Sequence, residues 1–215
     1  MSNWTYFGPE HQARALLAPL LALNPPVVAI DRVPWNKILA TAAFGIDAQL
    51  STNGFIRSIY SANLRTGISA SAFQACFDKT SAFYETHPAG RVSAVLLETF
   101  PNQAMMARGD DATAYPWRDA QANLLFCFQW DESLEGGEES VVGRAADELG
   151  RELRGDFARV SGYDGSGLRT LVNYAHGDET LEEVYGREKL GRLVALKGKW
   201  DPRNVFCFNN PLPVE

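Results

Sequence analysis

The chain has 215 residues, of which 46% are hydrophobic and 21% charged, and its formal net charge is −6 at pH 7. This composition is typical of a globular protein with one large domain or two small ones. The acidic balance, without any run of Lys or Arg, disfavours nucleic acid and anionic membrane surfaces as partners.

The cysteines and the first residues indicate the compartment. Cys76, Cys127 and Cys207 are widely separated and lack CxxC spacing, which argues against a disulfide framework or a zinc site. The N-terminal MSNWTYFGPEHQ has no basic region followed by an apolar one, so it is not a secretory signal. The longest apolar run, Ala15–Leu23, is too short to span a bilayer. We expect a soluble, cytoplasmic protein.

The N-terminal quarter of the chain predicts short elements. A strand is expected over residues 3–8, followed by a helix from Pro9 whose leucines recur on one face. Pro19 is expected to break this helix, because proline lacks a backbone donor. β-branched residues after two prolines favour a strand over 25–33, and a short helix is predicted over 34–46.

The middle of the chain predicts strands over 54–64, 91–100 and 121–130. A helix lies between the first two, with Ser69 or Ser71 as its N-cap. Its expected buried face consists of Phe73, Cys76, Phe77, Thr80 and Tyr84.

The last third of the chain predicts a long helix over 138–157, with Val142, Ala145, Leu149 and Leu153 buried. A strand over 168–174, a helix over 187–199 and a closing turn follow. Strands and helices alternate without a regular βαβ rhythm. The expected fold class is therefore α+β, with a mainly antiparallel sheet, helices packed on one face, and the other face free for a ligand or partner.

Four segments carry a family resemblance: YFGPEHQARALLAPLLALNPPVVAI, TAYPWRDAQANLLFCFQW, LVNYAHGD and WDPRNVFCFNNPLP. They resemble, respectively, a strand-to-helix region of fungal members, a Pro-x-Arg segment before a strand ending in Trp, a strand ending in Asn-Tyr, and an Asp-Pro-x-Asn-x-Phe closing turn. The family is that of the berberine bridge enzyme-like FAD-linked oxidases, and the resemblance covers nearly the whole chain.

The resemblance implies that residues 1–160 belong to the substrate domain and residues 161–215 to the C-terminal segment, together forming one compact unit. The N-terminal FAD-binding domain of the family is expected to be absent, with its pyrophosphate loop and covalent flavin attachment. GYDGSG does not replace that loop, because it precedes a predicted strand and not a helix. No cofactor is expected on the chain alone, and FAD only with a flavin domain on a separate chain.

Tyr174 and Asn173 match the Asn-Tyr motif near the flavin and substrate of the resembling enzymes. A phenol there can donate or relay a proton, or it can be a buried tyrosine with a structural hydrogen bond. His176 is a candidate general acid or base beside Tyr174. A metal site formed by His176 and Asp178 is disfavoured because a third ligand is missing.

Arg118 matches the arginine of the Pro-x-Arg segment and is suited to hold a carboxylate, an enolate or a backbone carbonyl. Glu98 interrupts an apolar strand, where a carboxylate is costly unless it is paired. We expect it to pair with Arg118 or Arg57, or to act as a general acid or base in the cleft.

Alternation along the strand 121–130 places three residues toward the ligand: Leu125, Cys127 and Gln129. Leu125 stands where the resembling enzymes often carry a Glu or Gln base, which puts their usual mechanism in doubt here. Arg57 and Tyr60 lie on opposite faces of one strand, so at most one of them faces the cavity. Tyr115 and Trp117 either line a pocket for an apolar ring system or pack in the core.

These residues predict a flavin-independent enzyme of natural-product metabolism, which isomerises, dehydrates or cyclises a small apolar or polyketide-like substrate. One alternative is the C-terminal subunit of a split FAD-dependent oxidoreductase, and another is a binding remnant without turnover. A bare apolar sheet face and strand edge favour self-association. We therefore expect a homodimer, the commonest oligomer.

Overall fold

The computed structural model describes residues 4–41, 54–134, 136–163 and 167–214. The chain divides into two compact units, residues 1–53 and 54–215, which are described separately. The boundary after residue 160 concerns family segments and stays a prediction.

The described part of the first unit is helical. α1 spans Glu10–Leu21, and the 3-10 turn η1, Trp35–Lys37, leads into α2, Ile38–Thr41. Pro19 lies inside α1 and does not break it, because the helix ends two residues later and loses only one backbone bond there. The strands predicted over 3–8 and 25–33 are wrong in their described residues, since no strand pairs with their backbone. Residues 42–46 of the predicted helix lie outside the described residues.

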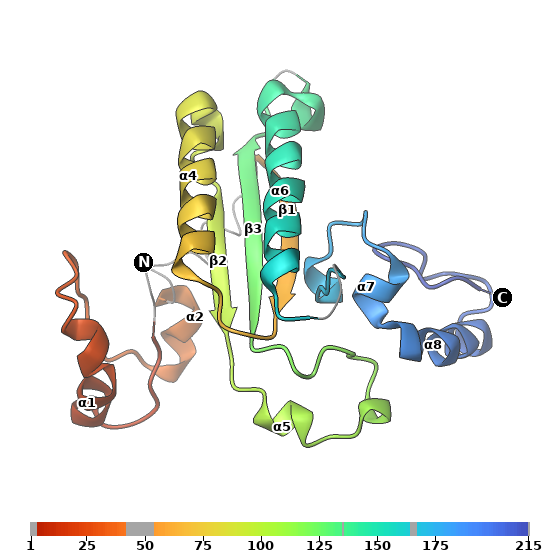
Figure 1. The fold of residues 1–215 in the computed structure, drawn as a ribbon, viewed down its shortest axis with the longest axis horizontal. Coiled ribbons are helices and arrows are strands. Elements are labelled where there is room, and N and C mark those ends of the chain that lie inside the picture. The colour runs from red at the N-terminus through yellow and green to blue at the C-terminus, as the bar shows by residue number, and fades with distance from the viewer. Residues whose placement is uncertain (1–3, 42–53, 135, 164–166, 215) are drawn as a thin grey trace. The chain divides into compact units, whose positions relative to one another are not determined.

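The second unit is built on a three-stranded antiparallel sheet, shown in Figure 1. Its strands are β1, Phe55–Leu64, β2, Ala94–Thr99, and β3, Ala122–Asp131, in the order β1-β3-β2. β3 is the central strand and is buried over most of its length, which explains its nearly continuous apolar sequence. The strands predicted over 54–64, 91–100 and 121–130 and the α+β class are confirmed.

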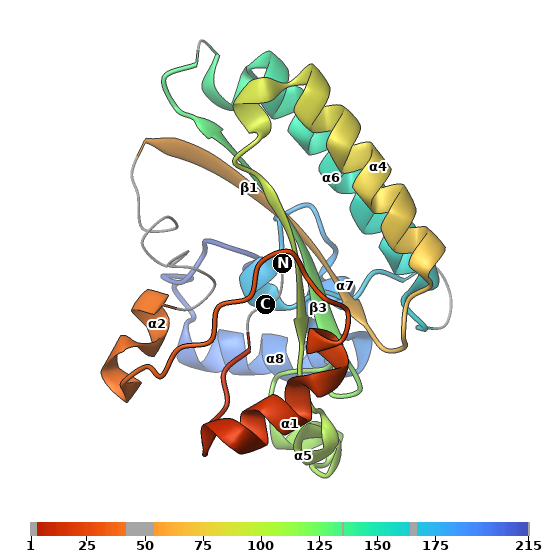
Figure 2. The same ribbon diagram turned by 90° about the vertical axis from the view of Figure 1, so that its left-hand side faces the viewer.

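Two long helices cover one face of this sheet: α4, Ala70–Thr86, and α6, Val141–Val160. They lie side by side in Figures 1 and 2. Each begins at a serine whose hydroxyl accepts a bond from a backbone N–H of the first turn, Ser69 in α4 and Ser140 in α6. The second helix begins three residues later than the expected start at 138, because the turn η5, Gly137–Glu139, precedes the cap.

The strand register decides which residues share a face of the sheet. Ile59 pairs with Cys127, and Ser61 pairs with Leu125. Directly paired residues of antiparallel strands point to the same side. The helix-covered face carries Leu124, Phe126 and Phe128 within the core. The opposite face, called the open face below, carries Leu125, Cys127 and Gln129, as alternation predicted.

Two burial predictions are wrong. Phe77 is 65% exposed, because the buried stripe of α4 contains the predicted Cys76 and Thr80 but continues to Phe83. β2 was expected to be a buried strand, but Val95 and Leu97 are 37% and 47% exposed. Among the described residues, this strand has a neighbour on one side only, so its side chains lie at the margin of the core.

The predicted strand over 168–174 is also wrong, because its backbone bonds go elsewhere. The Arg169 carbonyl accepts one bond from Asn63 N on β1, at 2.7 Å. Thr170 N instead donates to the Glu183 carbonyl, at 3.1 Å, and the Thr170 carbonyl accepts the Trp117 indole N–H, at 3.1 Å. The segment ends in the turn η6, Val172–Tyr174, and no ladder forms.

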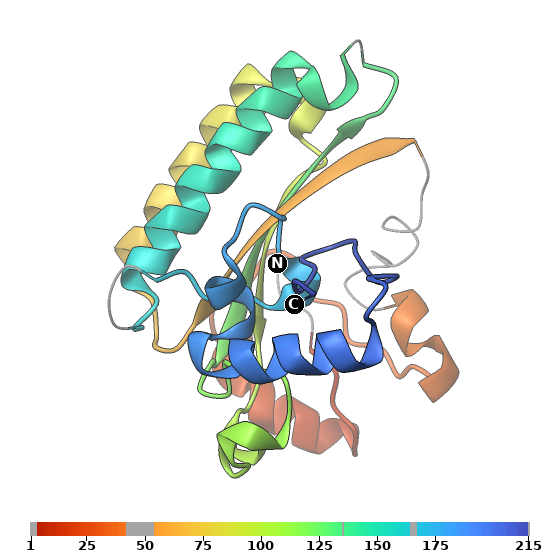
Figure 3. The same ribbon diagram turned by 90° about the vertical axis from the view of Figure 1, so that its right-hand side faces the viewer.

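The C-terminal elements lie across the sheet from α4 and α6, as Figure 3 shows. They are α7, Leu181–Tyr185, and α8, Arg187–Trp200, which confirms the predicted last helix. Asp201 closes the turn after α8, because its carboxylate accepts the backbone N–H groups of Val205 and Phe206 at 2.7 and 3.0 Å.

The remaining elements are single turns: η3, Pro88–Gly90, α5, Gln103–Met106, and η4, Asp110–Ala112. The last two belong to the long connection between β2 and β3. Of the helices in the described ranges, none combines the length and the apolar character that crossing a bilayer requires.

Candidate active site

Tyr174 and Glu98 meet on the open face of the sheet. The turn η6 directs the Tyr174 phenol to Glu98 on β2, where it donates to Oε1 over 3.2 Å. Ser61 on β1 holds the turn against the sheet, because its hydroxyl donates to the Tyr174 carbonyl over 3.1 Å. The C-terminal segment and the sheet therefore build this pair together.

The electrostatics of the pair favour a protonated phenol. Burial, then the charge of Glu98 and the hydrogen bond to it, raise the pKa of Tyr174 above its ordinary value. Burial and then the same charge raise the pKa of the Cys127 thiol to about 11. Since a neutral thiol is a poor nucleophile, this face offers proton transfer at Tyr174 and Glu98 and not thiolate chemistry.

A second polar pair lies on the open face, further along β3. Arg57 Nε donates to Gln129 Oε1 over 3.1 Å, and the two residues are partners in the strand register. Asn173 is exposed in the same turn as Tyr174. The structure thus brings to one region seven of the residues predicted for the site: Arg57, Glu98, Leu125, Cys127, Gln129, Asn173 and Tyr174.

Sequence reasoning missed Asn123, which adds a polar group to this face. It is the register partner of Glu98 on one side and of Asn63 on the other, so a polar row crosses all three strands. Asn123 is 6% exposed, and its Oδ1 has no hydrogen-bond partner among the described residues. A substrate hydroxyl or a bound water would satisfy it. Asparagines within apolar strands were the available signal.

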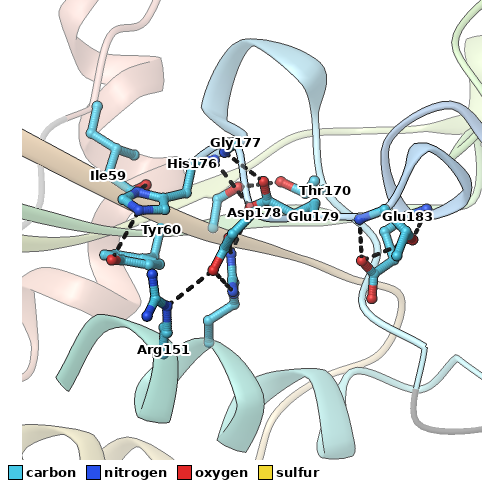
Figure 4. A network of polar contacts seen from close by, with 12 residues as sticks. Ile59, Tyr60, Arg151, Thr170, His176, Gly177, Asp178, Glu179 and Glu183 are labelled. Atoms are coloured by element: carbon cyan, nitrogen blue, oxygen red, sulfur yellow. Dashed lines mark hydrogen bonds and ion pairs between the residues drawn. The ribbon is translucent and has the colours of Figure 1, made fainter. Parts of the chain in front are cut away.

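Tyr60 and His176 lie apart from this pair, on the helix side of β1 (Figure 4). Tyr60 is fully buried, and its hydroxyl donates to Asp147 of α6. Its ring stacks on the imidazole of His176, with centroids 4.0 Å apart. His176 Nδ1 lies 3.2 Å from the Ile59 carbonyl oxygen. Because a carbonyl only accepts, that nitrogen carries a proton.

Asp178 binds two arginines of α6. Arg154 Nη1 lies 2.6 Å from Asp178 Oδ1 and 2.7 Å from Glu179 Oε1, and Arg151 Nε lies 3.0 Å from Asp178 Oδ2. Figure 4 shows the contact of Arg151 with Asp178, which together with the contacts of Arg154 holds the loop after Tyr174 on the helix. The side chains of His176 and Asp178 are thus engaged in anchoring this loop.

This anchor predicts an acid-dependent stability. Burial by itself raises the pKa of Asp178, but the hydrogen bonds and charge of Arg154, with Arg151, outweigh it and bring the pKa to about 2. A depressed carboxyl pKa stabilises the fold above its unfolded value, about 4, and the stabilisation is lost as the pH falls toward 2. We expect Asp178→Asn to lower the free energy of unfolding by about 1–2 kcal/mol at neutral pH, allowing for solvent screening.

Urea unfolding of the wild type and of Asp178→Asn, from neutral pH to about pH 2, measures the difference in their free energies of unfolding. It should shrink below about pH 4 and vanish once the carboxyl is protonated. A difference that stays constant over the whole range would show that Asp178 acts by packing and not by charge.

Arg118 and Trp117 bind partners other than Tyr174 and Glu98. Arg118 Nη2 donates to Thr113 Oγ1 at 2.6 Å, and its Nη1 donates to the Met105 carbonyl at 3.3 Å. The expected pairing of Glu98 with Arg118 is therefore wrong, since Glu98 accepts from Tyr174 instead. The Trp117 indole binds the Thr170 carbonyl, and Tyr115 is half-buried.

Comparison with known proteins identifies relatives over the whole chain. Residues 170–213 match the family model described as berberine and berberine like. The chain is 45% identical over 206 residues to the FAD-linked oxidoreductase srdI of Neurospora crassa, covering 96% of this chain and 40% of that protein. It is 45% identical over 216 residues to the FAD-linked oxidoreductase fogF of Aspergillus ruber, covering 100% and 42%. The chain thus spans about 40% of the length of these curated relatives.

Solved structures share the fold at low sequence identity. BBE-like #28 from Arabidopsis thaliana matches with a TM-score of 0.73 and 15% identity, over 98% of this chain and 46% of that one. The 6-hydroxy-D-nicotine oxidase from Arthrobacter nicotinovorans matches with a TM-score of 0.64 and 23% identity, over 97% and 43%. At such identities the likeness concerns the fold alone.

Proposed function

Because the chain belongs to the berberine bridge enzyme-like family of FAD-linked oxidoreductases, we propose that it forms the substrate-binding side of such an enzyme. The open face of the sheet receives the substrate, and Tyr174 with Glu98 removes the proton of a substrate hydroxyl group. The hydrogen bond of 3.2 Å from the phenol to the carboxylate carries this proposal. It joins the family's C-terminal segment to the sheet.

The proposed step is a relay of protons along this pair. The substrate proton passes to the Tyr174 oxygen as the Tyr174 proton passes to Glu98, so the carboxylate becomes a carboxylic acid and the substrate oxygen carries the negative charge. The raised pKa of Tyr174 keeps the phenol protonated until the substrate binds. The exposed Glu98 then returns the proton to solvent.

FAD would supply the electron acceptor for the oxidation, and the described residues fit one side of its ring. The half-buried side chains of Cys127 and Gln129, with the buried Leu125 beside them on the same face, offer a thiol and one amide to a planar heterocycle. The helices α4 and α6 begin at serines that cap their own first turns. These two helices therefore lack the open N-terminus that holds a pyrophosphate. We propose that the phosphates bind the flavin-binding part of such an enzyme.

Non-redox chemistry on the same pair is a second candidate function. Tyr174 and Glu98 complete a proton relay by themselves, which is what the isomerisation, dehydration or cyclisation of a polyketide-like compound requires. Leu125 favours this candidate, because an apolar side chain stands where the resembling oxidases often carry a Glu or Gln base.

Exposed aromatic side chains suggest where the flavin-binding part docks. Trp200, Phe206 and Phe208 at the C-terminal end are 74%, 79% and 83% exposed. Apolar patches of this kind usually mark interaction surfaces. We propose that the flavin-binding part of the oxidoreductase covers them, since the curated relatives are more than twice as long as this chain. A second copy of the chain is the alternative occupant.

Co-expression of the chain with the flavin-binding part of the Neurospora crassa relative tests the first candidate. Expression in a reducing cytosol suits the three free thiols, and we propose the cytosol as the compartment. We expect a one-to-one complex by light scattering, with the visible absorbance of an oxidised flavin. The double variant Phe206→Ser with Phe208→Ser is expected to prevent formation of this complex. A colourless homodimer that turns over a polyketide-like substrate would favour the second candidate instead.

A further inference from the structure

A cleft of about 400 Å³ lies where β1 ends, and neither Tyr174 nor Glu98 lines it. Its walls are mostly charged and aromatic. They include Arg65, Trp117, Arg118, Asp119, Tyr163 and Arg169. This volume lies within the range of small-molecule binding sites.

Arg118 lines this cleft and carries an unsatisfied donor. The residue is 7% exposed, and its two terminal nitrogens bind the Met105 carbonyl and the Thr113 hydroxyl. Its Nε–H has no hydrogen-bond partner among the described residues. Because a buried charged donor without an acceptor costs free energy, this group calls for an acceptor that the described residues do not supply.

Arg169 is a second guanidinium without a carboxylate partner in the described part of the chain. Its guanidinium carbon lies 4.7 Å from the centre of the Trp117 ring and 5.6 Å from that of Tyr163. Its hydrogen bond goes to the Leu168 carbonyl, at 3.1 Å. Stacking fixes the plane of the guanidinium and leaves donors along its edge.

Among the remaining charges of the cleft, Arg65 and Asp119 pair with each other, whereas the Asp110 carboxylate, which also lines the cleft, has no ion pair among the described residues. Arg65 Nε pairs with Asp119 Oδ2 at 3.1 Å, and the Tyr163 hydroxyl donates to Asp119 Oδ1 at 3.2 Å. Asp119 is therefore engaged twice, whereas Arg118 and Arg169 retain donors. The cleft thus has spare hydrogen-bond donors on positively charged groups.

We propose that this cleft binds a small oxyanion, a carboxylate or a phosphate group, through the Arg118 Nε–H and the edge of the Arg169 guanidinium. The planar donor edge of a guanidinium matches the oxygens of both groups. Trp117 and Tyr163 provide an aromatic wall for the rest of the ligand. This site does not depend on the oxidoreductase proposed above, and it assigns to Arg118 a role away from Tyr174.

Titration with inorganic phosphate and, separately, with benzoate tests the proposal, with chloride keeping the ionic strength constant. The nitrogen-15 signal of the Arg118 Nε–H should shift saturably with one or both anions, and the melting temperature should rise with anion concentration. The two arms distinguish a phosphate site from a carboxylate site.

Arg169→Gln should weaken the binding by about tenfold or more. Arg187→Gln is the matched control, because Arg187 is exposed and pairs with Glu182 on the surface; it should leave the affinity unchanged. The absence of a saturable shift with either anion, or equal affinities of the wild type and Arg169→Gln, would overturn the proposal.

Discussion

Replacing Tyr174 by Phe is expected to lower kcat/KM by roughly 100- to 10,000-fold while changing the free energy of unfolding by only about 1 kcal/mol. The change removes the hydroxyl that donates to Glu98 and keeps the ring. In both candidate functions the transferred proton passes through this hydroxyl, so the loss should appear in kcat more than in KM. Steady-state turnover is measured for oxidation in the flavin-loaded assembly and for non-redox conversion by the chain alone.

Two comparisons make this result specific. Tyr185→Phe removes a hydroxyl of the same C-terminal segment that donates to the Asn210 carbonyl, and it should leave turnover unchanged. Glu98→Gln should reduce turnover by itself but add little to Tyr174→Phe, because the two residues act as one unit. Full turnover of Tyr174→Phe would contradict the relay and leave Tyr174 as a packing residue.

Gly150→Ala in α6 is expected to destabilise the protein by about 2 kcal/mol. A methyl group at Gly150 would lie 2.2 Å from Cδ2 of Tyr60. The ring of Tyr60 has no room to retreat, since it is fully buried and stacked on His176. Alanine gains about 1 kcal/mol over glycine as a helix former, and the overlap with a rigid ring is expected to outweigh that gain.

Gly155→Ala is the matched control in the same helix. Its added methyl group would meet only the end of the flexible Arg159 side chain, at 3.6 Å. The helix propensity then acts alone, and a stabilisation of up to about 1 kcal/mol is expected. Urea unfolding of both variants measures the difference. Equal stabilities of Gly150→Ala and Gly155→Ala would contradict the close approach of α6 to β1.

The local sequence determined the elements whose pattern is self-contained. The continuous apolar run of β3 and the alternation that separates Leu124 from Leu125 required no knowledge of neighbours, because side chains of a strand alternate between faces. The serine cap of α4 and the buried stripe of α6 are likewise local signals. The family resemblance of residues 171–178 and of the closing turn could also be recognised from the sequence, since both motifs are short and contiguous.

The tertiary structure decided what depends on partners distant in sequence. The pattern of residues 168–174 predicts a strand, but the Thr170 N–H donates to the Glu183 carbonyl and the Thr170 carbonyl accepts the Trp117 indole N–H. Hydrogen bonds to a strand, a helix or a side chain satisfy a backbone equally well, so residue preferences alone do not choose among them.

The same reason applies to the sites. Strand pairing places Asn123 beside Glu98, and the turn η6 brings Tyr174 to that carboxylate. Arg118, expected to pair with Glu98, turns to Met105 and Thr113 instead. A long polar side chain reaches several partners with similar energy, so only the packing around it selects one.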